Sequence, residues 1–286
     1  MIGGKAYPMS DYEVPAAVAS DMAIWRYMDL ARFVSMLATK TLWFSKAAQF
    51  HDDPYEGYCR VTPAAMPADE YGPEPLTLEK TGGKPVPVSF HRFVAEVSHM
   101  SAEYFEKARE HLYVNSWCRA DESMAMWEIY GSSGRGVAVR SSVGRYRRAM
   151  KLPFGESQFA FGTVEYHADM TDIPDLDIDL RAGSIPMPGQ GVWERILKLA
   201  FHKRSCFEYE REWRGALYQD ARLEPGCNVE FELDELVGGV YVGPRADGFF
   251  YDMVASVMDR FGLVKPLECS TLLQPPRRHR SAVAGE

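Results

Sequence analysis

The spacing of apolar residues predicts both helices and strands. Leu30, Phe33, Val34 and Leu37 recur every three or four residues, which is typical of one helix face, and Asp29 precedes them as an N-cap. Short runs rich in aromatic and β-branched residues predict strands. Strands are expected at residues 24–27, 41–45, 113–118, 136–140, 159–166, 210–218, 228–233 and 237–242, and helices at 30–39, 90–110, 124–130, 192–207 and 249–261.

The order of these elements indicates the fold class. Strands do not alternate regularly with helices, so we expect an α+β fold, with a mixed, mostly antiparallel sheet and flanking helices in a single domain. That domain should span residues 21–273. An irregular arm is expected at 1–20, a Pro- and Gly-rich loop insertion at 62–87, and a disordered basic tail at 274–286.

Composition narrows the class of protein. The 286 residues are 46% hydrophobic and 25% charged, and 32 basic against 40 acidic residues give 32 − 40 = −8, which argues against a general nucleic-acid coat. Five cysteines without a CxxC pair predict free thiols in a reducing cytoplasm, and no zinc-ligand spacing is visible, so no metal site is expected. There is no secretory signal pattern and no apolar run of about 18 residues, so no membrane partner is expected.

Two closely spaced carboxylates are the first candidate site. Glu210 and Glu212 lie in the aromatic stretch 207–214, which predicts a strand. Alternate residues of a strand share a face, so both carboxylates should point the same way, and burial should raise the pKa of at least one. The alternative is an ordinary Glu–Arg network with Arg204 and Arg214.

Three further polar features are candidates, each with a structural alternative. Arg26 could hold a phosphate, or simply pair with a glutamate. The acidic turn with Asp52, Asp53 and Glu56 could bind Mg²⁺, or cap itself. Ser116 lacks the partners of a nucleophilic triad that a sequence could show, so a structural serine that bonds to the backbone is favoured over a nucleophile.

Aromatic residues near these positions could hold a planar ligand. Trp25 precedes Arg26, and Trp127 and Tyr130 lie in the short helix at 124–130. The glycine-rich stretch 131–136 follows that helix and precedes a strand. A phosphate-binding loop has the opposite order, so we expect a tight turn there.

Several segments together resemble the bacterial DUF2971 family, a domain of unknown function without an established activity. The segments are Trp25-Arg26-Tyr27, Leu42-Trp43-Phe44-Ser45, Phe50 with Asp52-Asp53-Pro54-Tyr55-Glu56, Ser116-Trp117-Cys118 with Ser123, Met126-Trp127-Glu128-Ile129-Tyr130, Gly134-Arg135-Gly136-Val137 and Tyr209-Glu210-Arg211-Glu212-Trp213-Arg214. The familiar pattern has Asn where this chain has Asp52.

A second resemblance is to ADP-ribosyltransferases. One branch has an Arg on an early strand, a Ser on a middle strand and a Glu-x-Glu on a later one, and Arg26, Ser116 and Glu210-Arg211-Glu212 occur in that order. The resemblance implies that Arg26 and Ser116 contact or support NAD. It also implies that Glu212 stabilises the reacting ribose and that Glu210 orients the acceptor. Cys118 replaces a Ser common in the middle motif.

These features lead to three functional hypotheses. The first is a nucleotide-binding enzyme, an NAD-dependent ADP-ribosyltransferase with Glu212 and Glu210 as catalytic residues. Its NAD would be bound by Arg26, Ser116, Trp25, Trp127 and Tyr130, and its acceptor would be a protein or a nucleic acid. The second is a metal-dependent hydrolase or nuclease that uses the acidic turn. The third is a non-catalytic sensor or interaction domain.

Overall fold

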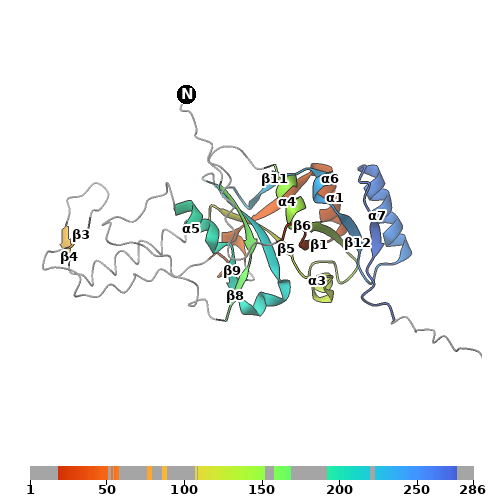
Figure 1. Cartoon of the computed structure of the whole chain (residues 1–286), viewed down its shortest axis with the longest axis horizontal. Coiled ribbons are helices and arrows are strands. Elements are labelled where there is room, and N and C mark those ends of the chain that lie inside the picture. Colours follow the sequence, from red (N-terminus) through yellow and green to blue (C-terminus); the bar gives the residue numbers. More distant parts are fainter. Residues whose placement is uncertain are drawn as a thin grey trace, which may run out of the picture. The chain divides into compact units, whose positions relative to one another are not determined.

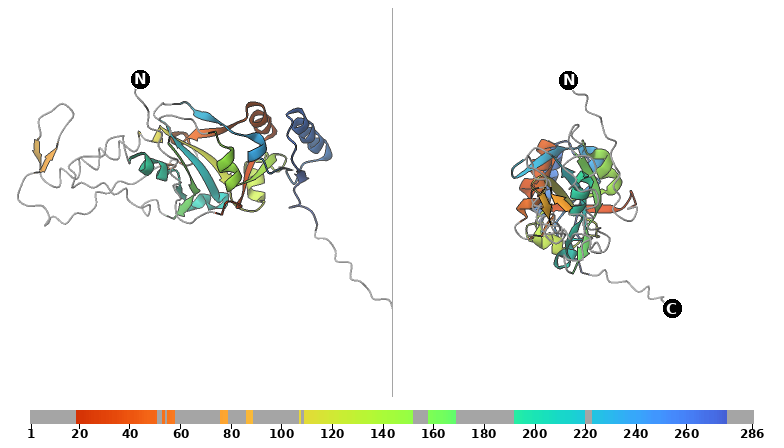
Figure 2. Two further views of the ribbon diagram at one scale, coloured as in Figure 1. Left: turned by 45° about the horizontal axis from the view of Figure 1, so that its top comes forward. Right: turned by 90° about the vertical axis from the view of Figure 1, so that its left-hand side faces the viewer.

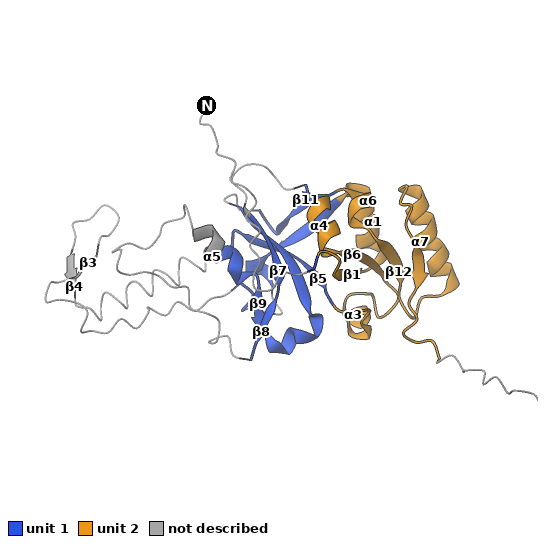
Figure 3. Cartoon of the chain, in the orientation of Figure 1, with its two compact units in different colours: residues 1–19, 41–119, 150–231 blue, residues 20–40, 120–149, 232–286 orange. Residues whose placement is uncertain are grey.

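The computed structural model describes residues 19–50, 53, 55–57, 76–78, 86–88, 107, 109–151, 158–168, 192–219 and 223–275 (Figure 1). These residues divide into two compact units, each assembled from separate stretches of the chain (Figure 3). Unit 1 takes its elements from residues 41–119 and 150–231. Unit 2 takes its elements from 20–40, 120–149 and 232–286.

Unit 1 is built on an antiparallel sheet. Its strands follow the order β11 (Gly226–Glu230), β2 (Thr41–Lys46), β5 (Leu112–Cys118), β10 (Glu212–Tyr218) and β7 (Gln158–Thr163). Strand β10 lies between β5 and β7 and pairs with both. Figure 2 shows two further views of the chain in the colours of Figure 1. Both of its faces are buried, so any charge on this strand needs a partner inside the protein.

Shorter elements complete unit 1. They are the 3₁₀ helix η1 (Ala47–Gln49), the antiparallel pair β3 (Leu76–Leu78) and β4 (Val86–Val88), the parallel pair β8 (Glu165–His167) and β9 (His202–Arg204), helix α5 (Val192–Leu199), and the 3₁₀ helix η5 (Ser205–Glu210). Large aromatic side chains fill the core. Trp213 stacks on Phe161 with ring centroids 6.0 Å apart, and the buried Trp117 indole donates to Asn115 Oδ1 over 2.8 Å.

Unit 2 has its own strand set. β1 (Ala23–Met28), β6 (Val137–Ser142) and β12 (Gly239–Val242) pair antiparallel in that order, and β13 (Leu267–Cys269) joins β12 in parallel. Its helices are α1 (Leu30–Thr39), α3 (Met124–Ile129), α4 (Val143–Ala149), α6 (Leu233–Leu236) and α7 (Gly248–Arg260). Within the described residues, no helix is both long and apolar enough to cross a membrane.

The expected α+β class is confirmed, as is the mixed and mostly antiparallel strand pairing. Helix α1 has the predicted bounds, and the Asp29 carboxylate accepts from Arg32 N over 2.7 Å as its N-cap. The stretch 131–136 is the expected tight turn, with Ser132, Ser133 and Gly134 at positive φ.

Three predicted elements are corrected. The helix expected at 192–207 ends at Leu199, because residues 202–204 pair with β8 instead. The strand expected at 159–166 is interrupted at Val164, whose N–H donates to the Glu212 carbonyl over 3.0 Å. The strand expected from Glu210 begins at Glu212, because Arg211 takes a left-handed conformation with φ 43°.

Other expectations fall wholly or largely outside the described residues. They concern Asp52, the arm at 1–18, the helix at 90–110, most of the insertion at 62–87, and the tail from 276. Cys118, Cys206, Cys227 and Cys269 are free thiols, and Cys59 also lies outside the described part.

Candidate functional site

A cluster of buried charged side chains lies in unit 1, at the start of β10. Arg214 is fully buried, and Glu212 is 4% exposed. The side chains of Glu212 and Arg214 lie on the same face of β10, because they are two residues apart on one strand. Isolated buried charges are costly, so the contacts around these two side chains decide what the cluster can do.

Arg214 binds two carboxylates at once. Its Nε donates to Glu212 Oε2 over 2.7 Å, and its second terminal nitrogen donates to Glu212 Oε1 over 2.9 Å. The same guanidinium holds Glu56, with one hydrogen bond of 3.0 Å and a second, shorter one, and it donates to the Ala200 carbonyl over 2.6 Å. These two carboxylates raise the pKa of Arg214 against the desolvation of its burial, so the side chain stays charged.

Lys203 is a second cation in the cluster, and it bridges Glu210 and Glu212. Its Nζ donates to Glu210 Oε2 over 2.5 Å and to Glu212 Oε1 over 2.6 Å, and it lies 3.9 Å from Glu56. Lys203 comes from β9, where it pairs in register with Tyr166 of β8. Glu210 and Glu212 therefore converge on one ammonium group, although Glu210 reaches it from η5 and not from a shared strand.

The pKa values of Glu210 and Glu212 move in opposite directions. Burial, and then the neighbouring Glu212, raise the pKa of Glu210 to about 7. Burial would also raise the pKa of Glu212, but Arg214 and Lys203 together outweigh it and hold that pKa well below its ordinary value. The expectation that burial would raise one of the two pKa values is confirmed.

The tyrosine of β8 fixes the backbone beside the cluster. The Tyr166 hydroxyl accepts from the Glu212 N–H over 2.8 Å. Burial is the main reason that the pKa of this hydroxyl is raised, so it stays protonated at neutral pH. Glu212 is thus held by its backbone as well as by both carboxylate oxygens.

Glu56 of the acidic turn reaches the same cluster, but the cation between it and Glu212 is the Arg214 side chain and not a metal ion. Glu56 meets Glu212 through the Arg214 guanidinium. Asp53 accepts from Arg204 Nε over 2.9 Å, which assigns Arg204 to the turn and not to Glu212. Of the two arginines expected in a Glu–Arg network, Arg214 is therefore the partner of Glu212, and Lys203 is an additional partner that the sequence did not indicate.

Ser116 lies next to this cluster in the sheet. It pairs in register with Arg214, and Cys118 pairs with Glu212. Directly opposed residues of antiparallel strands point to the same face, so Ser116 shares a face with Arg214 and Glu212. Unit 1 therefore brings together Ser116, Glu210 and Glu212.

The other expected site residues belong to unit 2. Trp25 is 6% exposed, and its ring centroid lies 4.7 Å from that of Tyr241. Trp127 is fully buried, and its indole donates to Glu122 Oε1 over 2.7 Å, whereas Tyr130 is exposed. Burial is the main cause that lowers the pKa of Arg26 to about 10, so it remains a cation at neutral pH. Their roles in binding NAD stay predictions.

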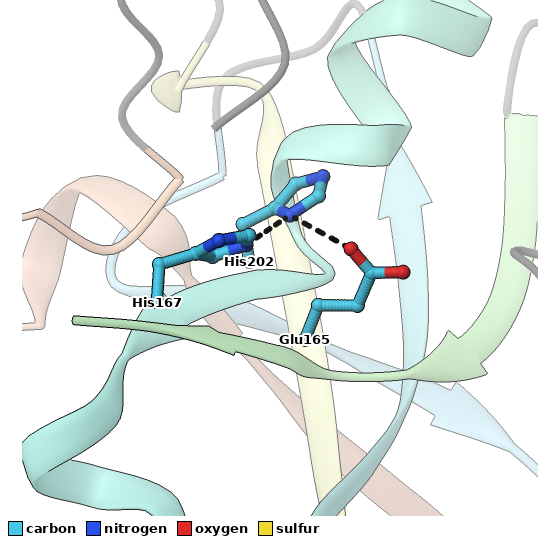
Figure 4. A group of neighbouring side chains, drawn as sticks. All are labelled: Glu165, His167 and His202. Carbon is cyan, nitrogen blue, oxygen red and sulfur yellow. Dashed lines mark hydrogen bonds and ion pairs between the residues drawn. The ribbon is translucent and has the colours of Figure 1, made fainter. Parts of the chain in front are cut away.

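A second group of polar side chains occupies the parallel pair β8 and β9. Glu165, His167 and His202 each place one metal-binding atom within 4.8 Å of the others (Figure 4). Burial, and then the neighbouring His167 and Lys198, lower the pKa of His202 to about 4, so its imidazole is neutral at physiological pH. No sequence signal indicated this group, because its two histidines are 35 residues apart.

Comparisons with known proteins found no matching family model and no matching curated protein, so the resemblance to DUF2971 has no support there. The chain is similar to solved structures of DarT from Thermus sp. 2.9. Those in complex with carba-NAD⁺, ADP-ribosylated ssDNA and NAD⁺ have TM-scores of 0.35, 0.37 and 0.36 and identities of 9%, 10% and 7%. The similarity covers 88%, 89% and 89% of this chain and 96%, 96% and 98% of those chains. A likeness at this level assigns neither a family nor a site to this chain.

Proposed function

We propose that this protein is an NAD-dependent ADP-ribosyltransferase in which Glu212 and Glu210 act as the catalytic carboxylates. The observation that carries the proposal is their convergence on the Lys203 ammonium, with Nζ distances of 2.6 Å and 2.5 Å. Two carboxyl groups that share one cation and differ in pKa provide a fixed anion and a group that can exchange a proton.

Glu212 is suited to the role of the fixed anion. When NAD is the donor, the bond from its ribose to nicotinamide breaks, nicotinamide leaves with the electron pair, and positive charge develops on the ribose. A carboxylate held by Arg214 and Lys203 stays ionised and needs no rearrangement as that charge develops.

Glu210 is suited to the role of the general base. Its pKa of about 7 leaves a large share of the carboxyl groups ionised at neutral pH, and those can take a proton. The acceptor would lose that proton to Glu210 as its nucleophilic atom bonds to the ribose carbon. Ser116, on the same sheet face, would support the bound donor.

The hydrolase alternative is less well supported by these contacts. It requires Mg²⁺ between the acidic turn and Glu212. The Arg214 guanidinium already lies between Glu56 and Glu212 and donates to both, so it occupies the position that a bridging metal ion would need.

The test combines NAD turnover with thermal unfolding. Release of nicotinamide and transfer of labelled ADP-ribose would be measured with single-stranded DNA, RNA and protein acceptors. Glu212→Gln should lower kcat about 10²–10³-fold, as expected when one electrostatic contact to a transition state is removed. Glu210→Gln should lower it about 10²–10⁴-fold and remove the dependence of kcat on pH near 7.

Glu208→Gln is the matched control, because Glu208 is an exposed carboxylate of the same 3₁₀ helix. It should leave both turnover and melting temperature unchanged. A lowered melting temperature in Glu212→Gln with unchanged kcat would identify the cluster as purely structural. The proposal also fails if the parent protein neither binds NAD nor transfers its ADP-ribose to any of the three acceptor classes.

A further inference from the structure

Successive side chains of β8 and β9 point to opposite faces of this two-stranded pair, and the two faces carry different residues. Tyr166 and Lys203 pair in register and contact the buried charge cluster. Their neighbours in sequence point to the opposite face, because successive residues of a strand alternate. That second face, on the side of β8 and β9 away from the charge cluster, carries Glu165, His167 and His202.

The three side chains of that face meet around one nitrogen. His167 Nε2 lies 3.0 Å from His202 Nδ1, and Glu165 Oε2 lies 3.8 Å from the same His202 nitrogen. Figure 4 shows both dashed lines reaching that atom of His202. The His202 side chain is 12% exposed and that of Glu165 is 41% exposed, so the group is reachable from solvent on the Glu165 side.

Two imidazole nitrogens at 3.0 Å cannot both present lone pairs, so one of them carries a proton that the other accepts. A divalent metal ion can take the place of that shared proton and bind both lone pairs. In tetrahedral coordination with Zn–N bonds of about 2.0–2.1 Å, ligand atoms are about 3.3 Å apart, so only small side-chain shifts would be required.

We propose that Glu165, His167 and His202 form a binding site for a divalent transition-metal ion, and that zinc is the ion they fit best. Two imidazoles and one carboxylate are typical of zinc ligands, whereas Mg²⁺ and Ca²⁺ prefer oxygen donors alone. Three protein ligands leave one tetrahedral position open to water.

Two cationic side chains lie near the proposed metal site, and they differ in their effect on it. Arg204, the in-register partner of His167, turns instead to Asp53 and stacks over the ring of Tyr55, with 5.1 Å from its guanidinium carbon to the ring centroid. Lys198 is close enough to act electrostatically on His202, and its charge should weaken metal binding.

The first experiment measures zinc binding by the full chain after chelator treatment and dialysis. Calorimetric titration with ZnCl₂ should give one equivalent bound per chain, and CoCl₂ should give the visible absorption of tetrahedral cobalt. Loss of an outer contact to a metal ligand already weakens binding about 10–100-fold. His167→Gln, His202→Gln and Glu165→Gln should therefore each weaken it at least about 100-fold.

His111→Gln is the matched control. His111 belongs to unit 1, and its Nδ1 lies 3.1 Å from the Gln219 carbonyl oxygen. It should bind zinc as the parent does. Zinc should raise the melting temperature of the parent and of His111→Gln, because the ion binds the folded chain preferentially, but it should not raise that of Glu165→Gln.

Two results would overturn the proposal. One is the absence of zinc and cobalt binding by the parent chain. The other is binding that all three ligand variants retain at parental affinity, which would place the ion elsewhere. If a histidine variant fails to fold, Glu165→Gln decides the matter, because the Glu165 side chain is 41% exposed. Zinc binding is measured without NAD, so its outcome is independent of the transferase proposal.

Discussion

Replacement of Arg214 by methionine should destabilise unit 1 strongly. The substitution removes two hydrogen bonds to Glu212, two to Glu56 and one to the Ala200 carbonyl. Lys203 remains 2.6 Å from Glu212 but 3.9 Å from Glu56, so Glu56 keeps only a distant cation. Breaking a buried ion pair by removing one partner costs about 3–5 kcal/mol, a large share of the roughly 5–15 kcal/mol that stabilises a typical protein.

The loss should depend on pH, with a sign that follows from the pKa of Glu212. In the parent this pKa lies below its ordinary value of 4.5, so the stabilisation is complete above about pH 4.5 and is lost as the pH falls through the lower folded value. In Arg214→Met, Glu212 is buried with less positive charge nearby and gains a proton more readily. The difference between variant and parent should therefore be largest at neutral pH and shrink on acidification.

Urea unfolding, followed by circular dichroism at pH 7.5 and pH 4.5, measures this difference. Arg245→Met is the control, because Arg245 forms an exposed ion pair with Glu128, and such pairs contribute about 0–1 kcal/mol. In the triple variant Arg214→Met, Glu56→Gln, Glu212→Gln, much of the stability should return, since fewer buried charges lack a partner. A cost for Arg214→Met no larger than that of the control would refute the reasoning.

Three smaller perturbations have equally definite outcomes. The pKa of Glu210 is about 7, so the folded chain keeps a proton that the unfolded chain releases, and this group lowers stability as the pH rises from about 4.5 to 7; Glu210→Gln should remove that fall in pH-dependent urea unfolding. Asp29→Ala should cost about 1 kcal/mol in thermal unfolding, because the N-cap bond to Arg32 N is lost, and Asp29→Asn should restore most of it. Gly243→Ala would place a Cβ 2.2 Å from the Gly134 carbonyl oxygen, so it should cost about 1–3 kcal/mol, and an unchanged melting temperature would contradict this.

The sequence predicts local elements of this protein better than it predicts how charges are paired. Helix α1 was predicted to the residue, because apolar spacing, an Asp N-cap and the following strand signal all agree. Glu210-Arg211-Glu212 resembles an alternating strand, yet Arg211 takes a left-handed conformation, and Glu210 closes a 3₁₀ helix. Periodicity cannot reveal such a break, because no glycine or proline marks it.

Arg214 was expected as a partner of the paired glutamates, but Lys203 could not be found from the sequence, for a different reason. Lys203 lies in a basic run that resembles a solvated helix end, and its burial depends on the three-residue pairing of β9 with β8. His167 and His202 likewise become neighbours only through that pairing, so no metal-ligand spacing exists in the linear sequence. Short strands of this kind are defined by tertiary contacts rather than by propensity.

The chain alternates between the two units, and this alternation constrains how the protein can fold during synthesis. The polypeptide passes from one unit to the other after residues 19, 40, 119, 149 and 231, so neither unit corresponds to a continuous piece of the message. Glu56 leaves the ribosome 158 residues before Arg214, the arginine that neutralises it inside the protein. A nascent chain cannot bury that carboxylate against Arg214 until nearly all of unit 1 has been translated, and pairings over such distances form slowly. Proteolysis or truncation at a single site would therefore separate parts of the same unit rather than release an intact half.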